Sequence, residues 1–184
     1  MRRLFLLTLP GLAVGFLAGV LAGGLTAIVG QSVDAALVAA LALGVPLALM
    51  GGGYTMLLIN RKVRLGGFAP VALYWLIGFP LARLLHELIL TWYVGGTPTL
   101  PPDTLGFLAF QGIISAGFAI GFLWLHERVA PYWWRRLAET DADARAVYSR
   151  YAEYATVMFE ARERRRASRG QRPGTSGKAA SRAR

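Results

Sequence analysis

The chain contains no cysteine among its 184 residues. Disulfides, zinc–thiolate sites, iron–sulfur clusters and cysteine nucleophiles are therefore excluded. It has only two histidines, His86 and His126, which is too few for a His-rich metal site. Charged residues make up 16% of the sequence, against roughly 25% in an average soluble domain. We therefore expect no metal and no cofactor, and a water-soluble domain is disfavoured.

The chain instead contains long apolar runs. Hydrophobic residues form 55% of the chain, and four runs stand out at 4–29, 35–59, 68–94 and 105–125. Each is longer than the roughly 20 residues that a helix needs to cross about 30 Å of hydrocarbon. Because the connections are short, sequential helices should be antiparallel neighbours. The sequence predicts an all-α, polytopic four-transmembrane-helix antiparallel bundle over residues 1–129.

Basic residues are distributed unevenly around these spans. They precede the first span, fill the second connection and follow the fourth span: Arg2, Arg3, Arg61, Lys62, Arg64 and a run that begins at Arg128. The first and third connections contain no Lys or Arg. By the positive-inside rule, both termini should be cytoplasmic. The excess of arginine over lysine, with abundant Ala, Gly and Leu, is typical of a GC-rich bacterial genome, so we expect a multi-pass protein of a bacterial plasma (inner) membrane.

The N-terminus allows one alternative. Arg2 and Arg3 followed by an apolar run resemble a cleavable signal peptide, and Ala18 to Ala22 contains small residues of the kind found at cleavage sites. The run is longer than the h-region of about 7–15 residues in such signals, so we expect the first span to be retained. Cleavage would leave three spans in the same orientation.

The segment 130–166 has a different composition. Trp133, Trp134, Arg135 and Arg136 form a predicted interface anchor, with rings at headgroup level and guanidinium groups on anionic lipid headgroups at the cytoplasmic face. Beyond residue 166 the chain has no apolar side chain larger than alanine. The sequence predicts a disordered basic tail over 167–184. No folded domain of a kind that recognises nucleic-acid bases accompanies the tail, so specific recognition of nucleic acid is not expected.

A cytoplasmic amphipathic helix is predicted to begin near Thr140, whose spacing from Asp143 is that of a capping box. Its apolar residues recur at intervals of three and four: Ala144, Val147, Tyr151, Tyr154, Met158 and Ala161. This pattern is less regular than that of a dedicated dimeric coiled coil. We therefore expect Val147, Tyr151, Tyr154 and Met158 to dock on a cytoplasmic protein, with pairing between two copies as the alternative.

The first span contains a glycine zipper. Gly11, Gly15, Gly19 and Gly23 recur every four residues and leave one helix face almost without side chains. Such a face lets another helix approach closely enough to gain dispersion contacts. Two interpretations follow: the face packs within the protein's own bundle, or it contacts another subunit or a second copy.

The third span carries an intramembrane polar cluster. Arg83, His86 and Glu87 share one helix face in an otherwise apolar segment. Tyr74–Trp75 and Trp92–Tyr93 resemble two aromatic belts about 26 Å apart, which places Arg83 near the bilayer centre. Either Arg83 and Glu87 form an internal ion pair supported by Gln111 of the fourth span, or the cluster binds a proton, an ion, a quinone or a lipid headgroup.

Catalytic motifs are lacking. The pairs His86–Glu87 and His126–Glu127 should lie at different depths, the second at the inner surface, so they cannot share a metal. No metalloprotease, nucleophile-elbow or phosphate-loop motif is present, which leaves an enzyme unsupported.

Two functional hypotheses remain. The first is a non-enzymatic accessory, assembly or scaffolding subunit of a larger bacterial inner-membrane complex, with other membrane-protein subunits as partners. The alternative is a small oligomeric transporter or ion- or proton-translocating protein that uses the Arg83 cluster. Pro46 and the triplet Gly51 to Gly53 would then weaken the second span as a hinge.

Overall fold

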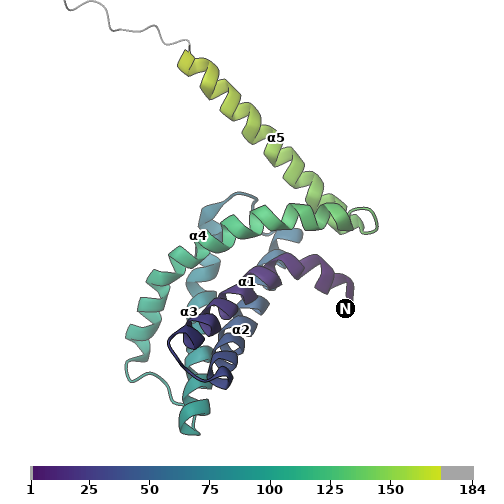
Figure 1. Cartoon of the computed structure of the whole chain (residues 1–184). Coiled ribbons are helices and arrows are strands. Elements are labelled where there is room, and N and C mark those ends of the chain that lie inside the picture. The colour runs from purple at the N-terminus through teal and green to yellow at the C-terminus, as the bar shows by residue number, and fades with distance from the viewer. Residues whose placement is uncertain (1, 171–184) are drawn as a thin grey trace, which may run out of the picture. The chain divides into compact units, whose positions relative to one another are not determined.

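The computed structural model describes residues 2–170 and is all-helical over that range (Figure 1). It contains five helices in the described residues: α1 (Arg2–Ile28), α2 (Val33–Ile59), α3 (Phe68–Gly95), α4 (Thr104–Leu137) and α5 (Ala142–Gly170). The chain divides into a first unit that ends at Tyr148 and a second that begins at Ser149. The first unit contains α1 to α4 and the start of α5.

Helices α1 to α4 are each long and apolar enough to cross a membrane, which confirms the four predicted runs and indicates a membrane protein. Their ends lie within two residues of those expected for the first three runs. Many of their large apolar side chains point outward, for example Leu25, Leu49 and Ile113. An outward apolar surface of this kind is what a lipid environment favours.

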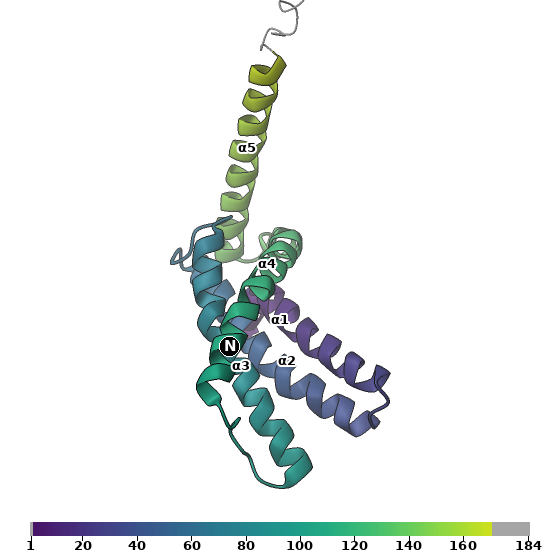
Figure 2. The same ribbon diagram turned by 90° about the vertical axis from the view of Figure 1, so that its left-hand side faces the viewer.

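Two helix pairs form the first unit. Helices α1 and α2 run side by side along their length, and α3 packs mainly on α4 (Figure 2). The pairs meet where α2 contacts α3 and where α1 contacts α4. All four helices continue through internal prolines, and α2 stays helical through Pro46 and the glycine triplet.

The N-terminal end of α1, the α2–α3 connection and the C-terminal end of α4 gather at one end of this unit. The Gly66 amide in the connection donates to the Glu127 carboxylate on α4 at 2.9 Å. The Trp133 indole donates to the Leu6 carbonyl on α1 at 2.7 Å. Gly66 has a φ of 69°, a left-handed conformation that glycine adopts without strain. These contacts therefore bring together the segments that carry most of the basic residues near the helix ends.

The fourth helix is longer than its apolar run. α4 continues twelve residues past residue 125, to Leu137, and includes Pro131. α5 then begins at Ala142, and its capping residue is Asp141 rather than Thr140, because the Asp141 carboxylate accepts from the amides of Asp143 and Ala144. α5 extends to Gly170, so residues 167–170 of the predicted disordered tail are helical. The rest of that predicted tail lies outside the described residues.

Candidate functional site

The polar cluster of α3 is arranged differently from the expected ion pair. The guanidinium Nη1 of Arg83 lies 2.7 Å from the ring Nδ1 of His86. Since a guanidinium can only donate, Nδ1 accepts, and the imidazole is neutral with its proton on Nε2. His86 is buried, with 7% of its surface exposed, and Nε2 has no partner within residues 2–170. Arg83 is half-buried.

Glu87 and Gln111 do not join this contact. Among the described residues no salt bridge joins Arg83 to Glu87, although the charge of Glu87 still acts on Arg83 over a longer distance. Gln111 is buried on α4 at 6% exposure, but no hydrogen bond joins it to the α3 residues in the part that the structure describes. In the described residues, the expected four-residue cluster thus contains one hydrogen bond, between residues a single turn apart.

Of the two predicted aromatic belts, Tyr74–Trp75 is part of the protein core. Trp75 is fully buried, and the Tyr74 hydroxyl donates to the Met50 carbonyl at 2.6 Å. Trp92 and Tyr93 remain exposed at 61% and 46%. The spacing of the two aromatic pairs therefore does not measure bilayer thickness, although Arg83 still lies near the middle of α3.

The glycine zipper packs against α2. A Cβ added at Gly11 would overlap the Gly51 carbonyl, and one added at Gly15 would overlap the Leu47 carbonyl. At Gly19 and Gly23 the obstacles are the backbone of Gly44, Ala40 and Ala36. The contact positions on α2 decrease as those on α1 increase, which is an antiparallel register along the whole helix. We call this contact the glycine interface; it covers Gly11, Gly15, Gly19 and Gly23, so these four glycines offer no free face to another subunit.

His126, which is predicted to lie at the inner surface of the membrane, forms a second polar site that is buried among the helices. It is fully buried, and its Nε2 lies 3.0 Å from the hydroxyl of Thr55 on α2. The same hydroxyl donates to the Gly51 carbonyl at 3.0 Å, so it is positioned to accept from the His126 ring. Nδ1 of His126 has no partner within the described residues.

An aromatic core surrounds His126. Its ring stacks on Phe122 at a centroid distance of 5.5 Å and meets the edge of Tyr54 at 5.7 Å. Ring contacts continue to Trp75 and, on the other side, to Trp134. A sequence signal for this site existed: buried residues recur on α4 at intervals of three and four, namely Ser115, Ala119, Phe122, His126 and Ala130. That periodicity continues past the end of the apolar run.

The predicted interface anchor divides into two parts. The indoles of Trp133 and Trp134 donate to the carbonyls of Leu6 and Leu7 on α1, at 2.7 and 3.0 Å. Trp134 is fully buried, whereas Arg135 and Arg136 are exposed. Proline at position 10 removes the N–H that would bond the Leu6 carbonyl. The Trp133 indole therefore satisfies an acceptor that the α1 helix itself leaves open.

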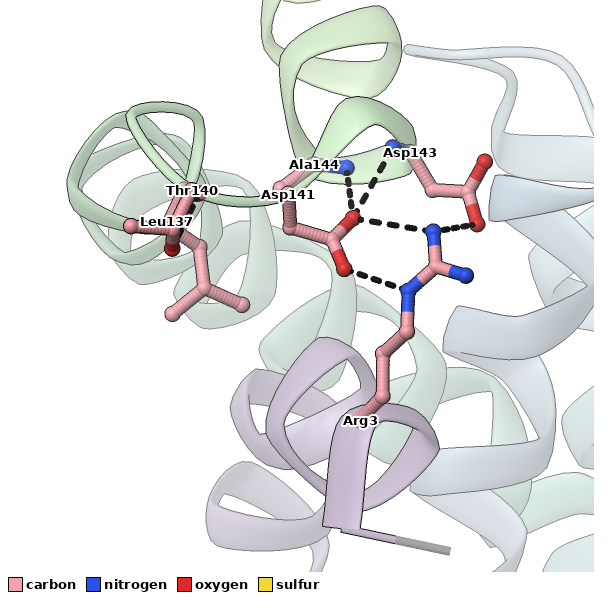
Figure 3. Close-up of polar contacts among 6 residues, drawn as sticks. All are labelled: Arg3, Leu137, Thr140, Asp141, Asp143 and Ala144. Atoms are coloured by element: carbon pink, nitrogen blue, oxygen red, sulfur yellow. Dashed lines mark hydrogen bonds and ion pairs between the residues drawn. The ribbon is translucent and has the colours of Figure 1, made fainter.

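A salt bridge joins the start of α1 to the cap of α5 (Figure 3). The Arg3 side chain donates to the Asp141 carboxylate at 2.5 Å and to the Asp143 carboxylate at 2.7 Å. The hydrogen bond from Arg3 holds the pKa of Asp141 below its usual value. The Asp141 carboxylate thus fixes both the N-terminal end of α1 and the first turn of α5.

Two adjoining apolar grooves lie between α2 and α3. The larger has a volume of about 620 Å³ and is lined by Val38, Leu41, Ala42, Val45, Ile89, Trp92 and Tyr93. The smaller has about 260 Å³ and shares Val45 with the first. Neither groove is lined by Arg83, His86 or Glu87.

The predicted docking residues of α5 differ in exposure. Val147 and Tyr151 are buried, with 2% and 8% of their surface exposed. Tyr154 and Met158 are exposed at 36% and 40%, and their neighbour Val157 at 62%. We call the exposed residues Tyr154, Val157 and Met158 the α5 strip.

No protein-family model matches the chain, and no curated protein and no solved structure is significantly similar to it.

Proposed function

We propose that the protein is a non-enzymatic accessory, assembly or scaffolding subunit of a larger complex in a bacterial inner membrane. The observation that supports this proposal best is the α5 strip. Three apolar side chains are exposed on a helix whose mean composition is polar and rich in arginine. Exposed apolar strips at helical spacing are typical of surfaces that bind another protein.

The sequence suggests two contact surfaces, the glycine zipper of α1 and the docking residues of α5. The glycine interface is occupied by α2, so its four α1 glycines cannot hold a partner helix without opening the α1–α2 pair. The α5 strip, in contrast, is exposed in the folded chain. We therefore assign partner binding to α5 and packing within the chain to the glycines.

The proposed orientation places both termini in the cytoplasm. Its support is the basic segments that gather at one end of the first unit, where positive charge favours the cytoplasmic side. The chain has no cysteine, so single cysteines at positions 31 and 62 can be labelled in intact cells. We expect a membrane-impermeant maleimide to label Gln31→Cys and to spare Lys62→Cys. The opposite pattern would reverse the orientation.

Native purification tests the proposed function. The chain is solubilised in mild detergent after crosslinking in its own membrane, and co-purifying proteins are identified by mass spectrometry. We expect a defined partner that is lost when the α5 strip is changed by Tyr154→Ser with Met158→Ser. Recovery of a pure, stable monomer without any crosslinked partner would refute the subunit proposal.

One observation favours the transporter alternative. The Nε2 of His86 is buried on an apolar helix without a partner in the described residues. A buried polar group without a partner costs free energy, so a group of this kind within a membrane helix is a candidate for a functional role. Arg83→Gln and Glu87→Gln test this alternative in turn, by growth or ion flux. Unchanged flux at a normal protein level would leave the Arg83–His86 contact with a structural role only.

A further inference from the structure

The α5 strip continues a heptad pattern whose first residues are buried. Ala144 and Val147 are buried within the first unit, and the same helix face then passes through Tyr154 and Met158 to Ala161. Positions three and four residues apart on a helix lie on one face. The exposed end of this face is therefore available to another helix that can add its own apolar side chains.

The C-terminal end of the strip carries more basic than acidic residues. Arg164 pairs with Glu160 at 3.1 Å, and Arg166 pairs with Glu163 at 3.3 Å. Arg165 occupies the position four residues after Ala161, on the face of the strip, and Arg162 lies beside it. Neither Arg162 nor Arg165 has an ion pair within residues 2–170. The acidic residues nearby are thus engaged by other arginines, and the end of the strip presents two uncompensated positive charges.

A second copy of the chain does not fit this surface. In a parallel pair, Arg162 and Arg165 would face the same arginines of the other copy, and like charges at such positions repel. In an antiparallel pair centred on the strip, they would face the segment around Val147, which is buried in the first unit. Both arrangements of two copies are therefore disfavoured.

A membrane surface fits less well than a protein helix. Glu153 lies four residues before Val157 on the same helix face, so its carboxylate would be held against anionic headgroups. Phe159 is exposed at 65% on the far side of α5 from the strip, where a helix lying on a membrane would present it to water.

We infer that the α5 strip binds an amphipathic helix of a cytoplasmic protein, in which acidic side chains follow the apolar face and pair with Arg162 and Arg165. This inference depends on the proposed function and adds the chemistry of the partner. The apolar contacts supply most of the affinity, and the two ion pairs select the acidic partner and set its register.

Two synthetic helices test the inference. Both carry leucine on one face over about three heptads, and the flanking positions are glutamate in one peptide and lysine in the other. Binding to the full-length protein in zwitterionic nanodiscs is measured by fluorescence anisotropy. We expect the glutamate peptide to bind at least about tenfold more tightly, and the preference to weaken at high salt. Equal affinity for both peptides, or none for either, would overturn the inference.

A matched pair of variants locates the charge effect. Arg162→Gln with Arg165→Gln should abolish the preference for the glutamate peptide. Arg164→Gln with Arg166→Gln removes the same number of charges from side chains that are already paired, and it should retain most of the preference. Equal losses in the two double variants would mean that overall charge, not the strip, selects the peptide, and would overturn the inference.

The membrane outcome is tested with Tyr154→Cys and Phe159→Cys, each labelled with a polarity-sensitive dye. On nanodiscs that contain phosphatidylglycerol, we expect the emission wavelength of the dye at position 154 to stay unchanged. Addition of the glutamate peptide should then shift this emission to the blue. A blue shift caused by the anionic lipid alone would overturn the inference. The proposed function fails separately, when native purification yields only a monomer, whereas peptide binding can still succeed.

Discussion

On one face, α2 meets α1 through backbone atoms, and on another it meets α3 across a groove. At the glycine interface, the distances leave no room for a Cβ at Gly11, Gly15 or Gly19. Between α2 and α3, a groove of about 620 Å³ separates the helices near Val38 and Trp92. The same helix thus has one contact that tolerates no added atoms and one that has space for them.

Two prolines show the same contrast. Pro10 frees the Leu6 carbonyl, and Trp133 donates to it. Pro46 frees the Ala42 carbonyl in the same way, but Ala42 lines the larger groove, and no side chain of the described residues donates to that carbonyl. Helices α1 and α2 are therefore packed tightly against each other, and α4 supports α1. Helices α2 and α3, in contrast, do not pack together along their whole length.

The largest effect is expected from Gly15→Leu. The new side chain would overlap the Leu47 carbonyl, so α1 and α2 must separate, at a cost of about 3 kcal/mol in unfolding free energy. Denaturant unfolding in detergent micelles, followed by tryptophan fluorescence, measures the loss. Gly24→Leu is the control, because nothing lies within 4 Å of a Cβ at that position of the same helix. Similar losses for both would contradict the glycine interface.

A smaller effect is expected from Trp133→Phe, which removes the donor to the Leu6 carbonyl. The expected cost is about 1 kcal/mol. In a Pro10→Ala background the cost should shrink, because residue 10 then has an N–H for that carbonyl. The double-mutant cycle in unfolding free energy gives the coupling. Additive costs would show that the indole does not replace the missing helix bond.

The Arg3–Asp141 contact should give a pH-dependent effect. Because Arg3 lowers the pKa of Asp141, the stabilisation is complete above the unfolded carboxyl pKa of about 3.9 and is lost as the pH falls through the lower folded value. We expect Arg3→Gln to lower the unfolding midpoint at neutral pH and to flatten the profile below about pH 4. Arg2→Gln is the control, and an identical profile for both variants would count against the contact.

The smallest effect is expected at the groove. Val45→Phe adds volume where the two grooves meet, and the side chain is 46% exposed. The unfolding free energy should change by less than about 1 kcal/mol, because no neighbour must move. A loss as large as that of Gly15→Leu would show that α2 and α3 close tightly in solution.

Length and hydropathy were sufficient to predict the four apolar helices. In lipid, a long apolar run is stable as a helix because the helix satisfies its own backbone hydrogen bonds. The ends of α1 to α3 lie close to the ends of the apolar runs in the sequence. The last twelve residues of α4 were missed because residues 126–137 are too polar to count as a span. Their helical form depends instead on contacts with α1 and α2, such as those of His126 and Trp134.

The candidate site was harder to predict for a related reason. Tryptophan near a helix end looks the same in sequence whether it contacts headgroups or another helix. Trp75 was therefore assigned to an aromatic belt and Trp134 to the interface anchor, although both are buried. Likewise, the zipper glycines reveal that a backbone approaches, but not which one. The Arg83–His86 contact depends on rotamers, and helical spacing alone favoured the Glu87 partner equally.

The glycine interface also sets an order of events during synthesis. The helix face at Gly11 stays uncovered until Gly51, forty residues later in the chain, has been synthesised. At about 5–20 residues per second, the ribosome needs roughly 2–8 s to supply that partner. For this interval the first helix has a face to which any neighbouring small-residue helix can bind. Rapid insertion of α1 and α2 as one hairpin would protect the nascent chain from such mispairing.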